Sequence, residues 1–182
     1  MPKSGKDHVV IEKSPHYFNF VNATKAFDEA PARVARMCSG MGLVVMVRDP
    51  VERAVSNYAM RVWEHEQGKV LGDAPPPFES EVLLPDGSVN EGHAYVQAGL
   101  YREHADRWMA HGFKRAQFLF LDFVQFRSDP AESLLQTEAF IGAPPTVSKE
   151  QFVVNPQTGF YCFQRTTSEK MKCAGKDKGL PH

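Results

Sequence analysis

An apolar run followed directly by a strong helix start constrains the fold of this chain most. Residues 42–47, Gly-Leu-Val-Val-Met-Val, form a continuous apolar segment typical of a strand buried on both faces of a parallel sheet. Asp49 can cap a helix, Pro50 suits the first helical position, and Glu52 stands where a capping box has its acid. A helix is therefore predicted from about Pro50 to Glu66, and the strand–helix pair indicates an α/β fold.

The remaining segments continue this alternation of strands and helices. The sequence predicts a strand at Val9–Ile11, a helix at Ala30–Met37, a helix at Ala94–His111, a strand at Gln117–Asp122 and a helix from Asp129–Pro130 to Gly142. This order predicts a three-layer sandwich with a mostly parallel central sheet. The length of 182 residues, 42% of them hydrophobic, suits one domain over residues 1–182.

Two stretches differ from the rest in composition. Residues 68–92 are rich in proline and glycine turn signals and predict an irregular surface excursion within the domain. In residues 151–182, aromatic side chains precede a series of lysines. Aromatic rings followed by cations fit a nucleotide-binding hairpin and loop.

Charge and composition exclude several classes of function. The formal net charge of -1 gives no global basic field, so we expect no nucleic-acid partner, and any anionic ligand must be held by a local cluster. No apolar run approaches the roughly 20 residues of a membrane span. The three cysteines match no zinc spacing, and we expect no metal site. A P-loop kinase-like enzyme is disfavoured because no Gly-x-x-x-x-Gly-Lys-Ser/Thr motif occurs.

The candidate anion site lies where the predicted strand meets the predicted helix. Arg48 follows the strand directly, at the sheet edge where open α/β sheets bind ligands and where a helix N-terminus favours phosphate. Ser56, about two turns into the helix, can offer a hydroxyl to the same anion. The alternative is that Arg48 pairs with a nearby carboxylate and Ser56 is an ordinary residue of the helix surface.

Two of the cysteines are candidates for a disulfide. Cys162 and Cys173 are close enough in sequence to staple a short hairpin, which leaves Cys38 unpaired. The alternative is three buried or inert thiols, as expected in a cytosolic protein.

Several segments together resemble a known family. They are Glu-Lys-Ser-Pro-His-Tyr-Phe at 12–18, Val-Arg-Asp-Pro-Val-Glu-Arg-Ala-Val-Ser at 47–56, Gly-Leu-Tyr at 99–101 with His104 and Trp108, Asn-Pro-Gln-Thr-Gly-Phe-Tyr-Cys at 155–162, and Cys-Ala-Gly-Lys-Asp-Lys-Gly-Leu-Pro-His at 173–182. Heparan-sulfate sulfotransferases, of the glucosaminyl 3-O-sulfotransferase and N-deacetylase-N-sulfotransferase type, carry similar segments in this order. The chain resembles that family over nearly its whole length, which implies a P-loop-NTPase-like sulfotransferase fold.

The resemblance implies roles for individual residues. Arg48 and Ser56 would contact the 3′-phosphate of the donor, 3′-phosphoadenosine 5′-phosphosulfate, and Tyr161 would pack near its adenine, unless Tyr161 is an ordinary core aromatic. The loop Lys178-Gly179-Leu180-Pro181-His182 would close over the phosphates. Lys13 would lie near the reaction centre and the sulfated-sugar site, where a cation stabilises developing charge; the alternative is a solvated lysine.

The implied function is transfer of a sulfuryl group from this donor to a hydroxyl or amine of a sulfated or N-acetylated, glycosaminoglycan-like polysaccharide. The implied location is the Golgi lumen, where Cys162 and Cys173 would form a disulfide. Asn22-Ala23-Thr24 would be a glycosylation acceptor there. The alternative function is a catalytically inactive fragment that binds the nucleotide or a sulfated glycan.

The resemblance also shows departures from the family pattern. Family members begin the domain with a lysine- and glycine-containing phosphosulfate loop, then a helix and a catalytic glutamate, and we expect both the loop and the glutamate to be absent from this chain. A segment similar to this loop occurs at Pro2-Lys3-Ser4-Gly5-Lys6. However, the strand predicted at Val9 leaves no room for the helix that follows the loop in the family. Leu180 replaces an arginine of the family's closing loop, which predicts weaker donor affinity. The catalytic residue is therefore left unassigned, and we expect this chain by itself to be weakly active or inactive.

Overall fold

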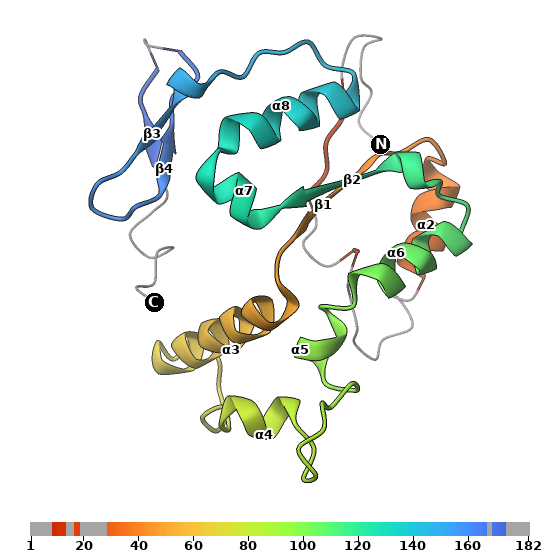
Figure 1. The fold of residues 1–182 in the computed structure, drawn as a ribbon, viewed down its shortest axis with the longest axis vertical. Helices are drawn as coiled ribbons and strands as arrows, with labels where there is room; N and C mark the ends of the chain where they lie inside the picture. The colour runs from red at the N-terminus through yellow and green to blue at the C-terminus, as the bar shows by residue number, and fades with distance from the viewer. Residues whose placement is uncertain (1–8, 14–16, 19–28, 167–168, 174–182) are drawn as a thin grey trace. The chain divides into compact units, whose positions relative to one another are not determined.

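The computed structural model describes residues 9–13, 17–18, 29–166 and 169–173 (Figure 1). The described residues group into two compact units. Unit 1 takes those within Met1–Ile11, Val44–Met46 and Leu119–His182, and unit 2 takes those within Glu12–Leu43 and Val47–Phe118. Each unit is described by itself below. The count of one domain over residues 1–182 stays a prediction.

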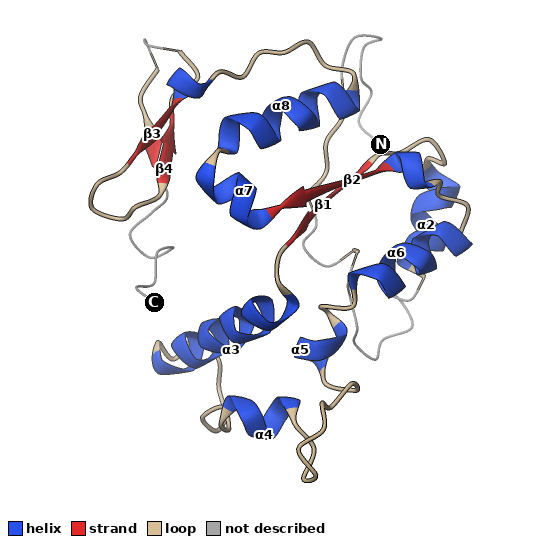
Figure 2. Ribbon diagram, in the orientation of Figure 1, coloured by secondary structure: helices blue, strands red, loops and turns tan. Residues whose placement is uncertain are grey.

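The parallel sheet is formed by β1, Leu43–Val47, and β2, Phe118–Asp122, which are neighbours and run in the same direction (Figure 2). Val45 and Leu121 are buried, at 8% and 5% exposure. Val44 and Met46 point to the other face and are 45% and 41% exposed, so β1 is buried on one face rather than on both. The α/β class with a parallel sheet is confirmed.

Two capped helices follow β2 in unit 1. Asp122 accepts hydrogen bonds from the backbone of Val124 and Gln125 and starts α7, Phe123–Ser128. Asp129 accepts from the backbone of Glu132 and starts α8, Pro130–Ile141, which ends at Gly142 in the left-handed conformation at φ 71. Helix α8 matches the prediction. Helix α7 was not predicted from the sequence, because six residues are too few to show the hydrophobic periodicity of a helix.

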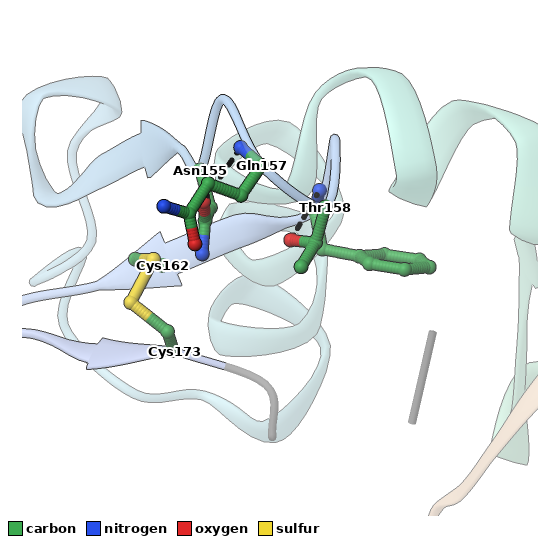
Figure 3. Close-up of a disulfide and its surroundings, with 6 residues drawn as sticks. Asn155, Gln157, Thr158, Cys162 and Cys173 are labelled. Carbon is green, nitrogen blue, oxygen red and sulfur yellow. Dashed lines mark hydrogen bonds between the residues drawn. A yellow bond between two sulfur atoms is a disulfide. The ribbon is translucent and has the colours of Figure 1, made fainter. Parts of the chain in front are cut away.

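A disulfide-linked hairpin completes unit 1. After the short helix η2, Lys149–Gln151, the strands β3, Phe152–Val154, β4, Tyr161–Phe163, and β5, Lys172–Cys173, pair antiparallel in the order β3-β4-β5. Cys162 lies opposite Cys173 and the two form a disulfide, which confirms the predicted pair (Figure 3). Cys38 is a free thiol, but it is half-buried rather than buried.

Unit 2 is helical. It contains α2, Ala30–Met37, α3, Pro50–Glu66, α4, Phe78–Val82, α5, Ala94–Gln97, α6, Tyr101–Ala110, and η1, Arg115–Gln117. The bounds of α2 and α3 are those predicted. The helix predicted over Ala94–His111 is instead broken into α5 and α6 at Gly99. A Cβ added at Gly99 would lie 3.0 Å from the Cβ of Pro50, so only glycine lets the chain pass this close to the start of α3.

The excursion over residues 68–92 is more ordered than predicted. It contains α4 and an isolated antiparallel bridge between Leu83 and Val89. Gly87, at φ 83, makes the turn that joins the two ends of the bridge. The prolines and glycines therefore mark turns between short ordered pieces rather than a continuous irregular loop.

The strand predicted at Val9–Ile11 is wrong. Residues 9–13 have no regular structure, and Val9, Val10 and Ile11 are 54%, 51% and 74% exposed. A short apolar run becomes a buried strand only where a neighbouring strand pairs with its backbone and other elements cover its faces. Among the described residues, no strand pairs with this segment.

The core of unit 2 is aromatic. Trp108 is completely buried, and Phe113 and Phe118 are 3% and 4% exposed. Phe113 meets Trp108 edge to face at a centroid distance of 5.1 Å and Phe118 at 6.5 Å. His104, on the same face of α6 as Trp108, is 5% exposed, and its Nε2 lies 2.9 Å from the carbonyl oxygen of Gln97.

We expect His104 to make unit 2 lose stability in mild acid. Burial lowers the pKa of His104 below its ordinary value of 6.5, and the hydrogen bond with the Gln97 carbonyl opposes this only in part. Below pH 6.5 the unfolded chain therefore binds a proton that the folded chain does not, so stability falls as pH drops through that value, by at most about 1.4 kcal/mol per pH unit. Urea unfolding at pH 7.5 and 5.5 should show a smaller loss for His104→Gln than for the native chain; equal losses would contradict this prediction.

Candidate functional site

The first candidate site is the start of α3 in unit 2. Strand β1 ends at Val47, and α3 begins at Pro50. The Oδ1 of Asp49 accepts from the backbone N–H groups of Val51 and Glu52, both at 2.9 Å, and fixes the first turn. Arg48 thus stands between a strand end and the N-terminus of a 17-residue helix, where the helix dipole favours an anion.

A local contact holds the Arg48 side chain against the first turns of α3. The Nη2 of Arg48 donates to the carbonyl oxygen of Glu52 at 2.7 Å. In an α-helix this carbonyl faces the N–H of the residue four positions on, which is Ser56. The Arg48 guanidinium therefore lies beside the turn of α3 that carries Ser56, as the predicted anion site requires. Ser56 itself is half-buried.

The alternative interpretation, in which Arg48 pairs with a nearby carboxylate, also agrees with the structure. Its Nη2 lies 3.6 Å from the Oε2 of Glu52, so the carboxylate expected in a capping box pairs with Arg48 instead. The Glu52 side chain is 63% exposed, whereas that of Arg48 is 22% exposed. An ion pair of this length with an exposed partner is worth less than about 1 kcal/mol. A phosphate with two or more charges can therefore displace Glu52 from Arg48.

A second arginine near this site was not singled out by the sequence analysis. The Nη2 of Arg53 donates to the backbone carbonyl of Tyr95 in α5. Burial lowers the pKa of Arg53, Tyr101 raises it, and the positive charge of Arg48 lowers it again. The available sequence signal was the position of Arg53, three residues before Ser56 and on the same side of the helix.

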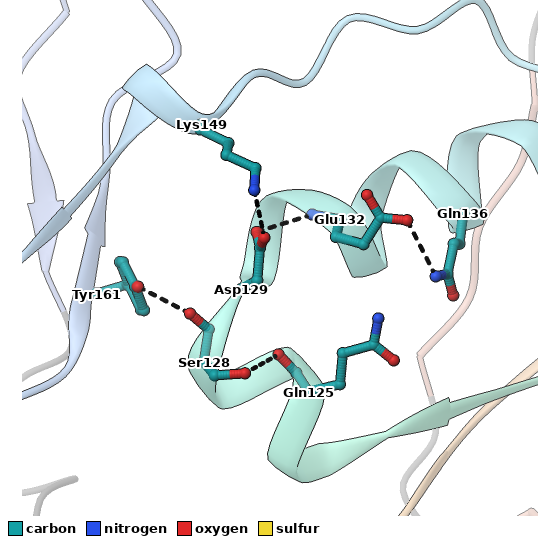
Figure 4. Close-up of polar contacts among 7 residues, drawn as sticks. All are labelled: Gln125, Ser128, Asp129, Glu132, Gln136, Lys149 and Tyr161. Atoms are coloured by element: carbon teal, nitrogen blue, oxygen red, sulfur yellow. Dashed lines mark hydrogen bonds and ion pairs between the residues drawn. The ribbon is translucent and has the colours of Figure 1, made fainter.

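Tyr161 belongs to unit 1, in β4. Its hydroxyl donates to the backbone carbonyl of Ser128 at the end of α7, at 2.9 Å (Figure 4). Its ring meets that of Phe152 in β3 edge to face at 6.4 Å. Tyr161 is half-buried and ties the hairpin to α7 within unit 1. Its predicted place near an adenine stays a prediction, beside its evident packing role.

A second polar contact joins the hairpin region to α8. The Nζ of Lys149 lies 2.6 Å from the Oδ2 of Asp129, the residue that caps α8 (Figure 4). The hydrogen bond from Lys149 lowers the pKa of Asp129, and the same bond raises the pKa of Lys149. Together with the Tyr161 hydroxyl, this pair holds β3 and β4 against the junction between α7 and α8.

The turn between β3 and β4 is fixed by side chains of the matched segment 155–162. The Oδ1 of Asn155 accepts from the backbone N–H of Gln157 at 2.9 Å, and the Oγ1 of Thr158 accepts from that of Phe160 at 3.4 Å (Figure 3). Gly159 closes the turn at φ 69. The turn joins β4 to β3 and the disulfide joins it to β5, so both set the position of β4.

Among the remaining predicted site residues, some lie within the described part of the chain and others lie outside it. Lys13 is described and exposed, and its role near a reaction centre stays a prediction. The loop Lys178-Gly179-Leu180-Pro181-His182 lies outside the described residues, as do Asn22 and the segment Pro2–Lys6. Arg48 and Ser56 belong to unit 2 and Tyr161 to unit 1.

The described part of the chain shows neither a metal-binding cluster nor a helix that could span a membrane. Within residues 9–13, 17–18, 29–166 and 169–173, no three His, Cys, Asp or Glu side chains come together as a metal ion would require. In the same part of the chain, no helix has both the length and the apolar character to cross a bilayer.

The family model and the relatives that match this chain agree with one another. The family model described as Sulfotransferase domain matches residues 36–180. The chain is 34% identical over 187 residues to the heparan sulfate glucosamine 3-O-sulfotransferase 3B1 of Mus musculus, and the match covers 100% of the chain and 44% of that relative. It is 32% identical over 186 residues to the heparan sulfate glucosamine 3-O-sulfotransferase 6 of Homo sapiens, over 100% of the chain and 49% of the relative. The chain thus spans less than half the length of these relatives.

A solved structure supports the fold. The crystal structure of a sulfotransferase from Alicyclobacillus acidocaldarius is similar to this chain with a TM-score of 0.52. The two are 20% identical, and the match covers 72% of this chain and 52% of that one.

Proposed function

Because the chain belongs to the sulfotransferase family, we propose that it binds 3′-phosphoadenosine 5′-phosphosulfate at the start of α3 and transfers the sulfuryl group to a heparan-sulfate-like polysaccharide. One observation carries this proposal. The Arg48 guanidinium lies beside the Ser56 turn, at the N-terminus of a helix capped by Asp49. A cation, a hydroxyl and a helix N-terminus together suit a 3′-phosphate dianion.

The chemistry proposed is an in-line displacement at sulfur. An acceptor oxygen forms a bond to sulfur as the bond from sulfur to the nucleotide's 5′-phosphate oxygen breaks, and the acceptor proton passes to a base. The products are a sulfate ester and 3′-phosphoadenosine 5′-phosphate. Arg48 and Ser56 contribute by fixing the donor in position, which supplies much of the rate in such transfers. The base is left unassigned.

The acceptor is proposed from the relatives. Their names state that they act on heparan sulfate glucosamine at the 3-O position. We propose the glucosamine 3-hydroxyl of a heparan-sulfate-type chain as the site of transfer, with Lys13 near the sulfated sugar. The Cys162–Cys173 disulfide requires an oxidising compartment, which supports work in the Golgi lumen.

A transfer assay tests this proposal. The chain is incubated with donor labelled on its sulfur and with heparan sulfate, chondroitin sulfate or no acceptor, and the labelled products are digested to disaccharides. We expect label on heparan sulfate alone, in disaccharides that carry a 3-O-sulfated glucosamine. Label on chondroitin sulfate would contradict the proposed acceptor. A folded chain that binds the nucleotide but transfers no label would agree with the weak activity or inactivity expected of this chain by itself. The catalytic part of the proposal would be contradicted if a chain extended at its N-terminus also transferred no label.

A further inference from the structure

One surface of unit 2 is basic, although the chain as a whole is not. Residues 30–47 and 107–121 contain no aspartate or glutamate, in a chain that has 22 such residues among 182. The exposed arginines and lysine of these two segments are together called the basic surface, and they are Arg33, Arg36, Lys114 and Arg115. Positive charge is therefore gathered locally within a formal net charge of -1.

One side chain joins the two segments of the basic surface. The Nε2 of Gln117 donates to the carbonyl oxygens of Ser39 and Met41, both at 2.9 Å, and its Oε1 accepts from the backbone N–H of Lys114 at 2.9 Å. A single amide group therefore links the loop after α2 to the start of η1. Helix α2 also packs against α6, which precedes η1 in the chain (Figure 1). The backbone that carries Arg36 thus lies near the backbone that carries Lys114.

The charges of this surface are available to a partner. Arg33 and Arg36 are three residues apart, so they lie on the same side of α2. Acidic residues at the start of α2 and on α6 are Glu29, Glu103 and Asp106. Among the described residues, no carboxylate forms an ion pair with Arg33, Arg36 or Lys114, and Asp106 pairs with Arg102 at 3.6 Å.

The basic surface lies at the other end of β1 from Arg48. Met41 precedes β1 and Arg48 follows it. The seven positions between them run along a largely extended chain, which corresponds to about 20 Å at about 3.3 Å per residue. A mononucleotide bound at Arg48 is too short to cover this distance. Only a long ligand can contact the basic surface while the donor site is in use.

A sulfated polysaccharide suits this surface better than other polyanions. Its sulfate groups form a long series of exposed negative charges, which several separated cations can bind together. Guanidinium groups also present paired donors that suit oxyanions. Nucleic acids carry a similar series of charges, but the Cys162–Cys173 disulfide indicates an oxidising compartment, where nucleic acids are not the common polyanion.

We propose that the basic surface binds a part of the polysaccharide acceptor that lies away from the donor site at Arg48. This second contact favours long, sulfated chains over short or unsulfated ones. The inference rests on the proposed function, because the polysaccharide is the acceptor named there. It adds a binding surface on α2 and η1 that takes no part in the transfer itself.

The test compares three chains by titration calorimetry with long heparan sulfate. One is the native chain, and the second removes three charges of the basic surface through Arg33→Gln, Arg36→Gln and Lys114→Gln. The matched control removes three exposed cations elsewhere, through Lys69→Gln, Arg127→Gln and Arg165→Gln. We expect the basic-surface variant to bind about tenfold more weakly than the other two chains, because each exposed charge pair contributes modestly.

Further measurements separate charge from structure. Replacing both helix arginines by lysine, as Arg33→Lys with Arg36→Lys, keeps the charge and should retain most of the affinity. In the glutamine variant, the slope of log affinity against log salt should fall by about two, because fewer counterions are released from the polyanion. The melting temperature and the affinity for 3′-phosphoadenosine 5′-phosphate should be the same in all of these chains.

The outcomes distinguish this inference from the proposed function. Equal affinity of the basic-surface variant and the control for heparan sulfate would overturn the inference alone, while nucleotide binding still supports the donor site. An equal loss for fully desulfated heparan sulfate, or a larger loss for a single-stranded nucleic acid, would overturn it as well. A native chain that does not bind heparan sulfate would overturn the proposed acceptor and this inference together.

Discussion

Replacing Arg48 with alanine should weaken the binding of 3′-phosphoadenosine 5′-phosphate by about a hundredfold, equivalent to about 2.7 kcal/mol. The loss is large because the side chain is only 22% exposed and its guanidinium sits at the helix N-terminus, where water screens a charge poorly. Structure should be little affected, since the Arg48–Glu52 pair contributes little to stability.

Calorimetric titration measures this effect directly. Arg48→Lys keeps the charge but loses the planar pair of donors, and we expect a weakening of about tenfold, between the native chain and Arg48→Ala. Arg102→Ala is a matched control, because Arg102 is 94% exposed and pairs with Asp106 on its own helix. If Arg48→Ala binds as tightly as Arg102→Ala, the 3′-phosphate does not bind at Arg48 and the proposed donor site is wrong.

Signals confined to neighbouring residues predicted the structure well. The pairs Asp49-Pro50 and Asp129-Pro130 predicted the starts of α3 and α8. This works because a capping side chain lies within four residues of the backbone groups that it caps. Gly142 correctly predicted the end of α8, because the glycine that ends a helix also directly follows it in sequence. The disulfide was implied by the resemblance to a family, and spacing alone had left its alternative open.

Features that depend on distant residues were missed. The break between α5 and α6 arises because Gly99 must pass close to Pro50, which no local pattern around Gly99 reveals. The segment Val9–Ile11 has the composition of a strand, but composition does not supply the partner that a strand requires. The exposed face of β1, with Val44 and Met46, likewise reflects what surrounds the sheet rather than the sequence of the strand.

The candidate site also contains residues that local sequence signals could single out and a residue that they could not. Arg48 and Ser56 could be singled out because both lie within one strand–helix unit, and the structure adds that Arg48 contacts both the carbonyl oxygen and the carboxylate of Glu52. Arg53 was missed because its place depends on a carbonyl contributed by Tyr95. A basic residue in a helix gives no sign in sequence of whether it faces water or the backbone of another helix.

Replacing Trp108 with alanine should cost about 3–5 kcal/mol of folding free energy. Trp108 is completely buried and packs edge to face on Phe113, so its removal leaves a large cavity in the core of unit 2. Natural domains are stable by only about 5–15 kcal/mol, so this single change should bring unit 2 close to unfolding. Because α6 and α5 hold the start of α3, the donor site should be lost with the core.

Urea unfolding followed by circular dichroism measures this loss, and a second substitution shows its origin. The Nε1 of Trp108 is buried without a hydrogen-bond partner among the described residues. Trp108→Phe keeps most of the apolar ring and removes this desolvated donor, so we expect less than half the cost of Trp108→Ala. Trp63→Ala serves as the control, because Trp63 is half-buried and its ring is covered by Lys69 at 3.8 Å, a contact worth about 1 kcal/mol. Equal losses from Trp63→Ala and Trp108→Ala would show that the aromatic cluster around Trp108 is not the core on which unit 2 depends.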